Sequence, residues 1–433
     1  MEILRACIFH TPRNAFDHPD SLIALPDGGL LTSEGKVLAC GDFSAVRAAS
    51  PEAPVRDLRG SYLLPGFIDT HIHFPQVRIL GGLGYSLLDW LDHLTLPEEA
   101  RLSDDTYATV IAREFVHQLA AHGTTTSLVF GAHFAPAMAA LFEAAATSGL
   151  RVISGLVLAD RLLRPELHVT PEQAFEASKL LLGRYHGHGR IRYAVIPRFA
   201  LSASEPMLEV CHTLLRENPT LHFTSHINEN PLEVTEVARL FPWAADYLAV
   251  YERFGLIGRR SVLAHNVQAT APELHRLAAS QCSIAHCPAS NAALGSGIFP
   301  MRRHLEARVH FALGTDVGGG TGFGMMKEAL LAYLLQRVAP DPLTLSPAQM
   351  LYLATRAGAE ALALDETLGD FTPGKSADFV CLNPPGDSAL AGVLRRLEDP
   401  ERILAAILTM AGPETIREVR VAGDLIFENQ LTH

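Results

Sequence analysis

Eight short apolar runs alternate with longer segments of helical spacing between about residues 63 and 335, and this alternation constrains the fold more than any other feature. Segments such as Tyr107–Ala121 and Pro171–Tyr185 carry apolar residues spaced as on one face of a helix. Because strands that alternate with helices pair in parallel, the sequence predicts an α/β fold, a closed (β/α)8 TIM barrel over residues 65–368. The runs are Leu64–Phe74, Thr124–Phe130, Arg151–Ala159, Ile191–Leu201, Leu221–Glu229, Ser261–Val267, Ser283–Pro288 and Val309–Asp316.

The pattern changes at both ends of the chain. Residues 1–64 and 369–433 hold short strand-like runs separated by turns, such as Gly35–Asp42 and Ile416–Gly423. The full length of 433 residues leaves room for a second unit beside a barrel. We therefore expect the two ends to form one composite β-sandwich domain together.

The composition argues against several classes of binding partner. A net charge of −12 argues against nucleic acid, because binding to phosphates depends on clustered Lys and Arg. No apolar run is long enough for a signal peptide or a membrane span, so we expect a cytoplasmic protein with no membrane partner. The six cysteines are scattered, which favours reduced, buried thiols over a disulfide framework.

A long connection follows the first predicted barrel strand. It runs from Pro75 to Leu102 and contains Gly81-Gly82-Leu83-Gly84. Long loops at the carboxyl ends of barrel strands are usually functional, so we interpret this one as a lid over the substrate. The alternative is a loop that packs between two protomers and has no role in substrate binding.

Histidines and a carboxylate fall at the carboxyl ends of the predicted strands, where barrel enzymes build their active sites. His71 and His73 are two positions apart on a strand and so point to the same side. A lone His-x-His is weak evidence, but His226, His265 and Asp316 end later strands. Imidazole and carboxylate groups that converge in this way predict a hydrolytic metal site formed by all five residues.

Glu229 follows His226 by three residues and lies just past its strand. A carboxylate beside a metal site can move protons between water, base and leaving group, and Asp316 could equally take the proton of the attacking water. Capping of the following helix is the structural alternative for Glu229. We take Glu229, Asp316 and His265 as the catalytic residues.

Six segments, at these strand ends and in the long connection, resemble those of the guanine deaminases within the amidohydrolase superfamily. The ligand set is typical of the whole superfamily, whereas Pro75-Gln76, Pro197-Arg198-Phe199 and His226-x-x-Glu229-Asn230 narrow the resemblance to guanine. The matching segments are residues 65–76, 87–91, 196–200, 225–230, 285–291 and 313–320, with Pro373–Asp378 common across the superfamily.

The resemblance implies a zinc-dependent hydrolase of purine catabolism that acts on the C–N bond of a cyclic amidine. One zinc would activate water to attack C2 of guanine, which gives xanthine and ammonia, and the chain would form a homodimer. Gln76 and Arg198 would read the edge of the base, Phe199 would hold its ring, and Glu229 would protonate a ring nitrogen. The remaining groups that would border the base are His73, His226 and Asp316.

Arg198 and Gln76, which would bind the edge of the base, could each have a purely structural role instead. Arg198 can donate to the O6 or N7 acceptors of guanine, but it can also pair with a neighbouring carboxylate. Gln76 can cap a loop instead of binding the base.

The sequence predicts one metal per chain. Binuclear amidohydrolases commonly bridge two metals with a carboxylated lysine on a barrel strand, and the one lysine between His71 and Asp316 is Lys179, in a helical segment. The corresponding strand carries Arg198, which cannot lose its proton to be carboxylated. Zn2+ fits the ligand set, and Fe2+ is also compatible with it.

Three alternatives stay open at this level. A deaminase of another aminopurine or of a pteridine, such as one acting on 8-oxoguanine, would share most of the chemistry. A non-deaminating amidohydrolase of the phosphotriesterase or hydantoinase kind is weakened by the missing strand lysine. A non-catalytic scaffold would be expected to have lost ligands.

Overall fold

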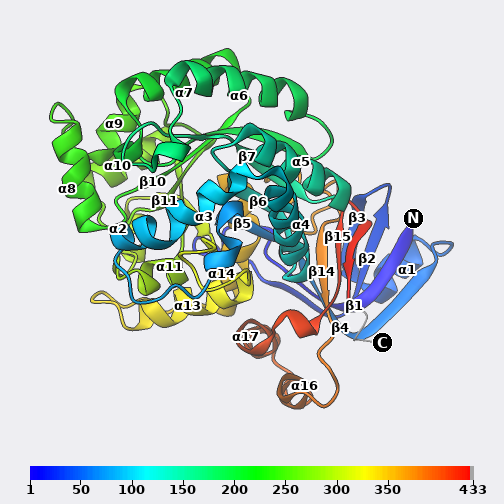
Figure 1. Ribbon diagram of the computed structural model, residues 1–433. Helices are drawn as coiled ribbons and strands as arrows, with labels where there is room; N and C mark the ends of the chain where they lie inside the picture. Colours follow the sequence, from blue (N-terminus) through cyan, green and yellow to red (C-terminus); the bar gives the residue numbers. More distant parts are fainter. Residues whose placement is uncertain (430–433) are drawn as a thin grey trace.

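The computed structural model describes residues 1–429 and confirms the α/β barrel (Figure 1). Eight parallel strands in this part of the chain follow one another around the barrel, and a short strand, β8 (Val157–Leu158), pairs with β9. The eight strands are β5 (Phe67–His73), β6 (Thr124–Phe130), β7 (Arg151–Gly155), β9 (Ile191–Pro197), β10 (His222–Ile227), β11 (Ser261–His265), β12 (Ser283–His286) and β13 (Phe311–Leu313).

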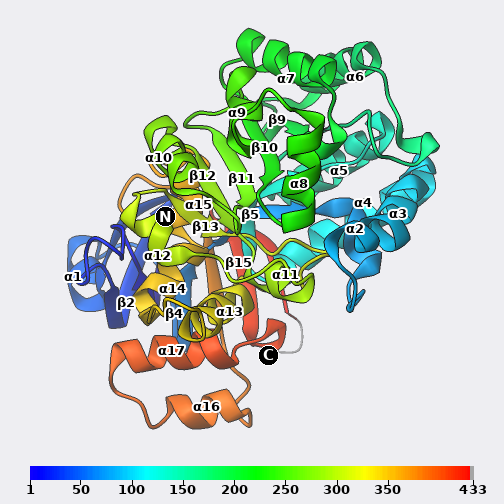
Figure 2. The same cartoon turned by 90° about the vertical axis from the view of Figure 1, so that its left-hand side faces the viewer.

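Helices alternate with these strands and cover the outside of the barrel (Figure 2). None of the helices within residues 1–429 is both long and apolar enough to cross a membrane. In the barrel region they are α2 (Leu87–Trp90), α3 (Leu96–Ala100), α4 (Asp105–Ala121), α5 (Ala135–Ser148), α6 (Pro171–Tyr185), α7 (Glu205–Glu217), α8 (Pro231–Leu240), α9 (Tyr247–Arg253), α10 (Ala271–Ser280), α11 (Pro288–Ala293), α12 (Met301–Glu306), α13 (Met325–Arg337), α14 (Pro347–Ala354) and α15 (Arg356–Ala361).

The first and last strands of the barrel meet beyond the end of β13. The Asp316 N–H donates to the carbonyl of His71 at 2.8 Å, and the His73 N–H donates to the carbonyl of Val317 at 3.1 Å. Gly314 permits this approach, since a Cβ there would lie 2.8 Å from the His71 Cβ. These few bonds, rather than a regular ladder among the described strands, complete the barrel and join two predicted metal ligands.

A buried carboxylate, that of Asp69, stabilises this junction between β5 and the segment after β13, which we call the seam. Asp69 accepts hydrogen bonds from the Thr315 Oγ1 at 2.5 Å, from the Thr315 N–H at 3.1 Å and from the His71 N–H at 3.1 Å. Burial raises the pKa of Asp69 to about 7, although the Thr315 and His71 donors oppose this rise. The side chain thus ties the start of the seam to the segment that carries Asp316.

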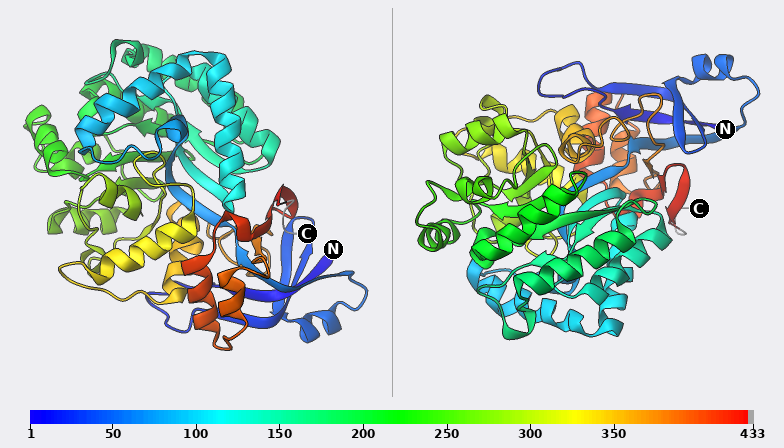
Figure 3. Two further views of the ribbon diagram at one scale, coloured as in Figure 1. Left: turned by 60° about the horizontal axis from the view of Figure 1, so that its bottom comes forward. Right: turned by 90° about the horizontal axis from the view of Figure 1, so that it is seen from above.

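The two ends of the chain form one mixed sheet at the side of the barrel, as the predicted fold requires (Figure 3). Its strand order is β16-β15-β14-β4-β1-β2-β3, and β4 leads through Gly66 directly into β5. The limits 1–64 and 369–433 stay a prediction, and residues 430–433 lie outside the described residues. The strands are β1 (Glu2–His10), β2 (Ile23–Ser33), β3 (Lys36–Asp42), β4 (Val55–Pro65), β14 (Phe379–Leu382), β15 (Ile416–Val421) and β16 (Asp424–Glu428), with α1 (Phe43–Ala49) after β3.

The C-terminal segment also contains two helices that the sequence analysis did not predict, α16 (Ala389–Leu394) and α17 (Pro400–Met410). Helix α17 packs against α13 and α14 of the barrel (Figure 2). It begins at Asp399, which caps the Arg402 N–H, and it buries Leu404, Ile407 and Leu408. This apolar spacing was a readable helix signal inside a segment that otherwise holds strands.

We expect Asp69→Ala to destabilise the protein by roughly 3 kcal/mol, because three buried donors lose their acceptor. Calorimetric unfolding measures this as a fall of several degrees in Tm. Asp57→Ala is the control, since Asp57 pairs with Arg59 on the surface and such pairs contribute little. Equal Tm values for the two variants would contradict the role of Asp69.

Candidate active site

Four predicted ligands form a compact buried group at the carboxyl ends of the strands. Ligand atoms of His71, His226, His265 and Asp316 all lie within 4.8 Å of one another, and all four residues are buried. His73 adjoins this group, with its Nε2 3.2 Å from the His71 Nε2 and 3.1 Å from the Asp316 Oδ1. The fold therefore brings together all five groups that the sequence analysis selected.

Hydrogen bonds on the outer ring nitrogens orient two of these histidines. The His226 Nδ1 donates to the carbonyl of Arg198 at 2.5 Å, and the His265 Nδ1 donates to the Asn291 Oδ1 at 2.9 Å. Each bond leaves Nε2 free to bind a metal, as outer contacts of metal-bound histidines usually do. The His265 Nε2 is buried and has no hydrogen-bond partner within the described residues.

Electrostatics favour a cation at this place. Burial lowers the pKa of His71 to about 4, and it lowers the pKa of His226 well below the ordinary value. The rings are therefore neutral at pH 7, which is the form that binds metal. Burial alone would raise the pKa of Asp316, but the hydrogen bonds of His71 and His73 lower it well below its usual range. Imidazoles grouped beside a carboxylate fit a divalent metal.

The backbone is strained where the ligands emerge. His265 and Asp316 adopt left-handed φ angles of +74° and +48°, which are uncommon for non-glycine residues. Gly319 follows closely behind, and a Cβ there would lie 3.1 Å from the Asp316 Oδ2 and 2.9 Å from the Ser290 Oγ. The glycines after Asp316 thus allow the backbone to approach the site.

A pocket of about 320 Å3 opens beside the metal group. The predicted substrate-binding residues Gln76, Arg198 and Phe199 all line it, together with Glu229. The complete lining is His73, Gln76, Leu87, Trp90, Leu91, Arg198, Phe199, His226, Glu229, His265, Leu294 and Asp316.

The connection after β5 supplies the apolar side of this pocket, as the lid interpretation requires. Leu87 and Trp90 of α2 and the adjacent Leu91 line the pocket. Leu87 and Trp90 are buried in a small cluster with Leu294, which follows α11. The pocket is thus lined by apolar side chains of this cluster as well as by the polar side chains of Gln76, Arg198 and Glu229.

Glu229 lies at the edge of the metal group and does not cap the next helix. Its Oε2 is 3.4 Å from the His265 Nε2, and its Oε1 accepts a hydrogen bond of 3.4 Å from the Ser296 Oγ. Asn230 caps α8 instead, in a capping box with Glu233. Burial, with a smaller contribution from the charge of Asp316, raises the pKa of Glu229 well above its ordinary value.

The site contains one buried acid that the sequence analysis missed. The Glu99 Oε2 lies 2.6 Å from the Arg198 Nη1 and 3.2 Å from the His133 Nε2, and the Gln76 Nε2 donates to its Oε1 at 2.9 Å. The ion-pair alternative for Arg198 is therefore present, and the Gln76 Oε1 also accepts a long bond of 3.4 Å from the Gly318 N–H. Glu99 stands in Leu-Pro-Glu-Glu-Ala, which the sequence presents as an ordinary first helical turn.

The residues that line the pocket and form the metal group include no lysine that could bridge two metals. Lys179 lies on the outer helix α6 and pairs with Glu217 at 2.8 Å. Within residues 1–429, only one group of side chains is arranged to hold a metal.

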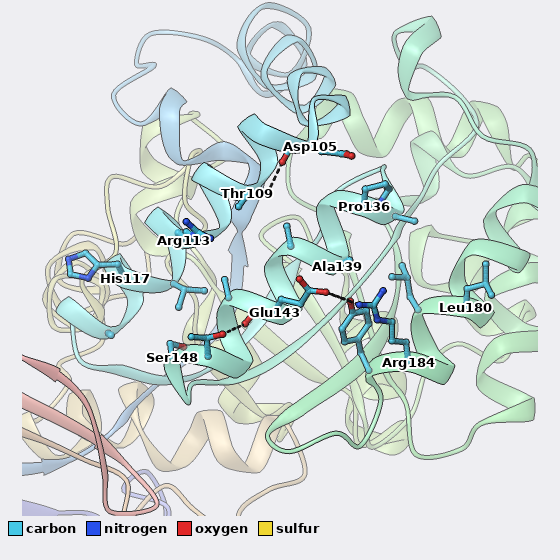
Figure 4. A pocket seen from close by; sticks show the side chains of 18 of the residues that line it. Asp105, Thr109, Arg113, His117, Pro136, Ala139, Glu143, Ser148, Leu180 and Arg184 are labelled. Carbon is cyan, nitrogen blue, oxygen red and sulfur yellow. Dashed lines mark hydrogen bonds and ion pairs between the residues drawn. The ribbon is translucent and has the colours of Figure 1, made fainter.

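A larger surface hollow lies elsewhere, between α4, α5 and α6 (Figure 4). Alanines of α5 and the paired Glu143 and Arg184, 2.9 Å apart, line much of it. It contains none of the five metal-site residues. We therefore place the chemistry in the smaller pocket at the strand ends.

We expect His226→Ala to weaken metal binding by at least about 100-fold, because it removes a ligand from a set of only a few. Metal analysis of the purified protein and competition with a chelator measure the change. His212→Ala is the control, since His212 lies on α7 and donates to the Phe254 carbonyl away from the site. Full metal content in the first variant would exclude His226 as a ligand.

Comparison with known proteins agrees with this geometry. The amidohydrolase family profile matches residues 62–426. A probable guanine deaminase of Deinococcus radiodurans is 56% identical over 436 residues, which cover 99% of both chains. The guanine deaminase of Escherichia coli K12 is 37% identical over 95% of this chain and 94% of that protein. The solved structure of the E. coli guanine deaminase superposes with a TM-score of 0.96 at 36% identity, covering 99% of this chain and 100% of the other.

Proposed function

This chain belongs to the amidohydrolase family, among its guanine deaminases, and we propose that it hydrolyses guanine to xanthine and ammonia. The observation that carries the proposal is the pocket beside the metal group. Its wall joins Arg198 and Gln76, which can read a base, to Glu229, which can transfer a proton. The full-length identity to guanine deaminases supports the same substrate.

We propose zinc as the metal, held by His71, His73, His226, His265 and Asp316. A zinc ion bound there would lower the pKa of water and so supply a nucleophile at neutral pH. The neutral imidazoles and the single carboxylate suit zinc, and Fe2+ is the alternative. The homodimer stays a prediction from the family resemblance.

Two carboxyl groups of this chain, Asp316 and Glu229, would carry out the proton transfers. Asp316 lies beside both His71 and His73 and would take a proton from the water that attacks C2. Glu229 would protonate a ring nitrogen as C2 becomes tetrahedral. The proton held by Asp316 would then pass to the departing amino group while the new C2 hydroxyl returns its proton to Glu229, so that ammonia leaves, xanthine remains and both carboxyl groups are restored. One water is consumed for each ammonia released.

Recognition of the base would depend on Arg198 and Phe199, which line the same pocket. Arg198 carries only hydrogen-bond donors, which match the O6 and N7 acceptors of guanine. Phe199 is buried beside His226, with ring centroids 5.9 Å apart, and would hold the purine ring in the plane that faces the metal.

The proposed activity is tested by ammonia release from guanine, 8-oxoguanine, cytosine and adenine under identical conditions. We expect guanine to be turned over with the highest kcat/KM, because it combines a C2 amino group with acceptors at O6 and N7. Turnover of another base with guanine inert would refute the substrate assignment.

We expect Glu229→Gln to retain its metal and to lose turnover by about 100- to 10,000-fold, the usual contribution of a general acid or base. Steady-state kinetics and metal analysis of the same preparation measure both quantities. Glu236→Gln is the control, because Glu236 pairs with Arg239 on the exposed face of α8. Retained activity in Glu229→Gln would exclude the proton transfer proposed for it.

A further inference from the structure

Glu99 connects three side chains around the pocket without lining it. Its carboxylate accepts from the Gln76 Nε2 on one oxygen, and from Arg198 and His133 on the other. Each of the four side chains is at least nine-tenths buried. Only Gln76 and Arg198 reach the pocket, so Glu99 can act on a bound base only through them.

The carboxylate fixes the orientation of Gln76. An ionised carboxylate has no hydrogen to donate, so the group that faces it must be the Nε2 of the amide. The Oε1 of Gln76 consequently points to the Gly318 N–H, 3.4 Å away. Without Glu99, only this long bond to the Gly318 N–H would fix the amide, and its orientation toward the pocket would be less well defined.

The same carboxylate neutralises the charge of Arg198 and holds its side chain in place. A guanidinium that is only 3% exposed is costly to bury unless a partner neutralises it. Glu99 supplies that partner through one Nη, 2.6 Å away. The other N–H groups of Arg198 stay available, and all of them are donors.

Glu99 also belongs to the lid. Helix α2, the π-helical turn Leu91–Thr95 and α3 follow one another without a break, and α3 carries Glu99. The start of this segment contributes Leu87, Trp90 and Leu91 to the apolar side of the pocket. The ion pair to Arg198 therefore attaches the lid to the wall that reads the base.

We propose that Glu99 is a positioning residue that sets the base specificity of this site, which rests on the function proposed above. By holding Gln76 in one orientation and Arg198 in place, it keeps the wall selective for a purine with an oxo group at C6. A purine with an amino group at C6 would place its donors against those of Arg198 and would bind poorly.

The test compares guanine with 2,6-diaminopurine, which keeps the reacting C2 amino group and replaces O6 with an amino group. For Glu99→Gln we expect the KM for guanine to rise on the order of 30- to 100-fold while kcat changes by less than about threefold, because uniform binding is lost. The preference for guanine over 2,6-diaminopurine, as a ratio of kcat/KM, should fall by about tenfold or more. The metal content should equal that of the wild type.

Glu98→Gln is the matched control. Glu98 is the preceding residue on the same turn and is also buried, but it pairs with Arg101 and accepts from the Tyr107 hydroxyl. This variant should keep the wild-type KM and the wild-type preference. An equal loss toward both purines in Glu99→Gln, or a parallel loss of metal, would show a merely structural role and overturn the inference.

Other outcomes are also decisive. A wild type that deaminates guanine, with Glu99→Gln unchanged in KM and preference, would overturn this inference alone. A wild type inactive on both purines would overturn the proposed function and this inference with it. If Glu99→Gln does not fold, Glu99→Asp keeps the charge with a shorter reach, and it should give an intermediate KM and preference. Wild-type values in Glu99→Asp would then contradict the proposal.

Discussion

The seam between β5 and β13 is the constraint on which the site depends. The hydrogen bond from the Asp316 N–H to the His71 carbonyl, 2.8 Å long, joins the two ends of the barrel. It also places the carboxylate of one ligand beside the ring of another, with the Asp316 Oδ1 3.2 Å from the His71 Nε2. Because the bonds that complete the barrel also position the ligands, metal binding should reinforce the fold.

Buried charge organises the rest of the pocket in two separate groups. At the metal group, Asp316 lies among neutral imidazoles and is suited to a cation. On the substrate wall, Glu99 and Arg198 neutralise each other, so this pair needs no metal. Glu229 borders the first group and still faces the pocket. This separation lets the metal group and the base-reading wall be perturbed independently.

Much of the architecture follows from short-range sequence patterns. Apolar runs that alternate with helical spacing predicted the eight strands, and parallel strands bring their carboxyl ends to one rim. Five polar residues at those ends therefore predicted the metal group without any knowledge of side-chain positions. Helix α17 was missed because its spacing stands between strands, and its burial depends on contacts with α13 and α14.

The sequence by itself determined the barrel, the group of histidines and Asp316 at its rim, and the residues that we propose to face the base. It could do so because strand ends and two-residue alternation are local properties. Only the tertiary structure decided what those residues contact. Gln76 and Arg198 are 23 and 99 positions from Glu99, yet all three meet through one buried carboxylate. Nothing in Leu-Pro-Glu-Glu-Ala distinguishes Glu99 from Glu98, since the direction in which each side chain points is set by how the lid segment packs against the barrel.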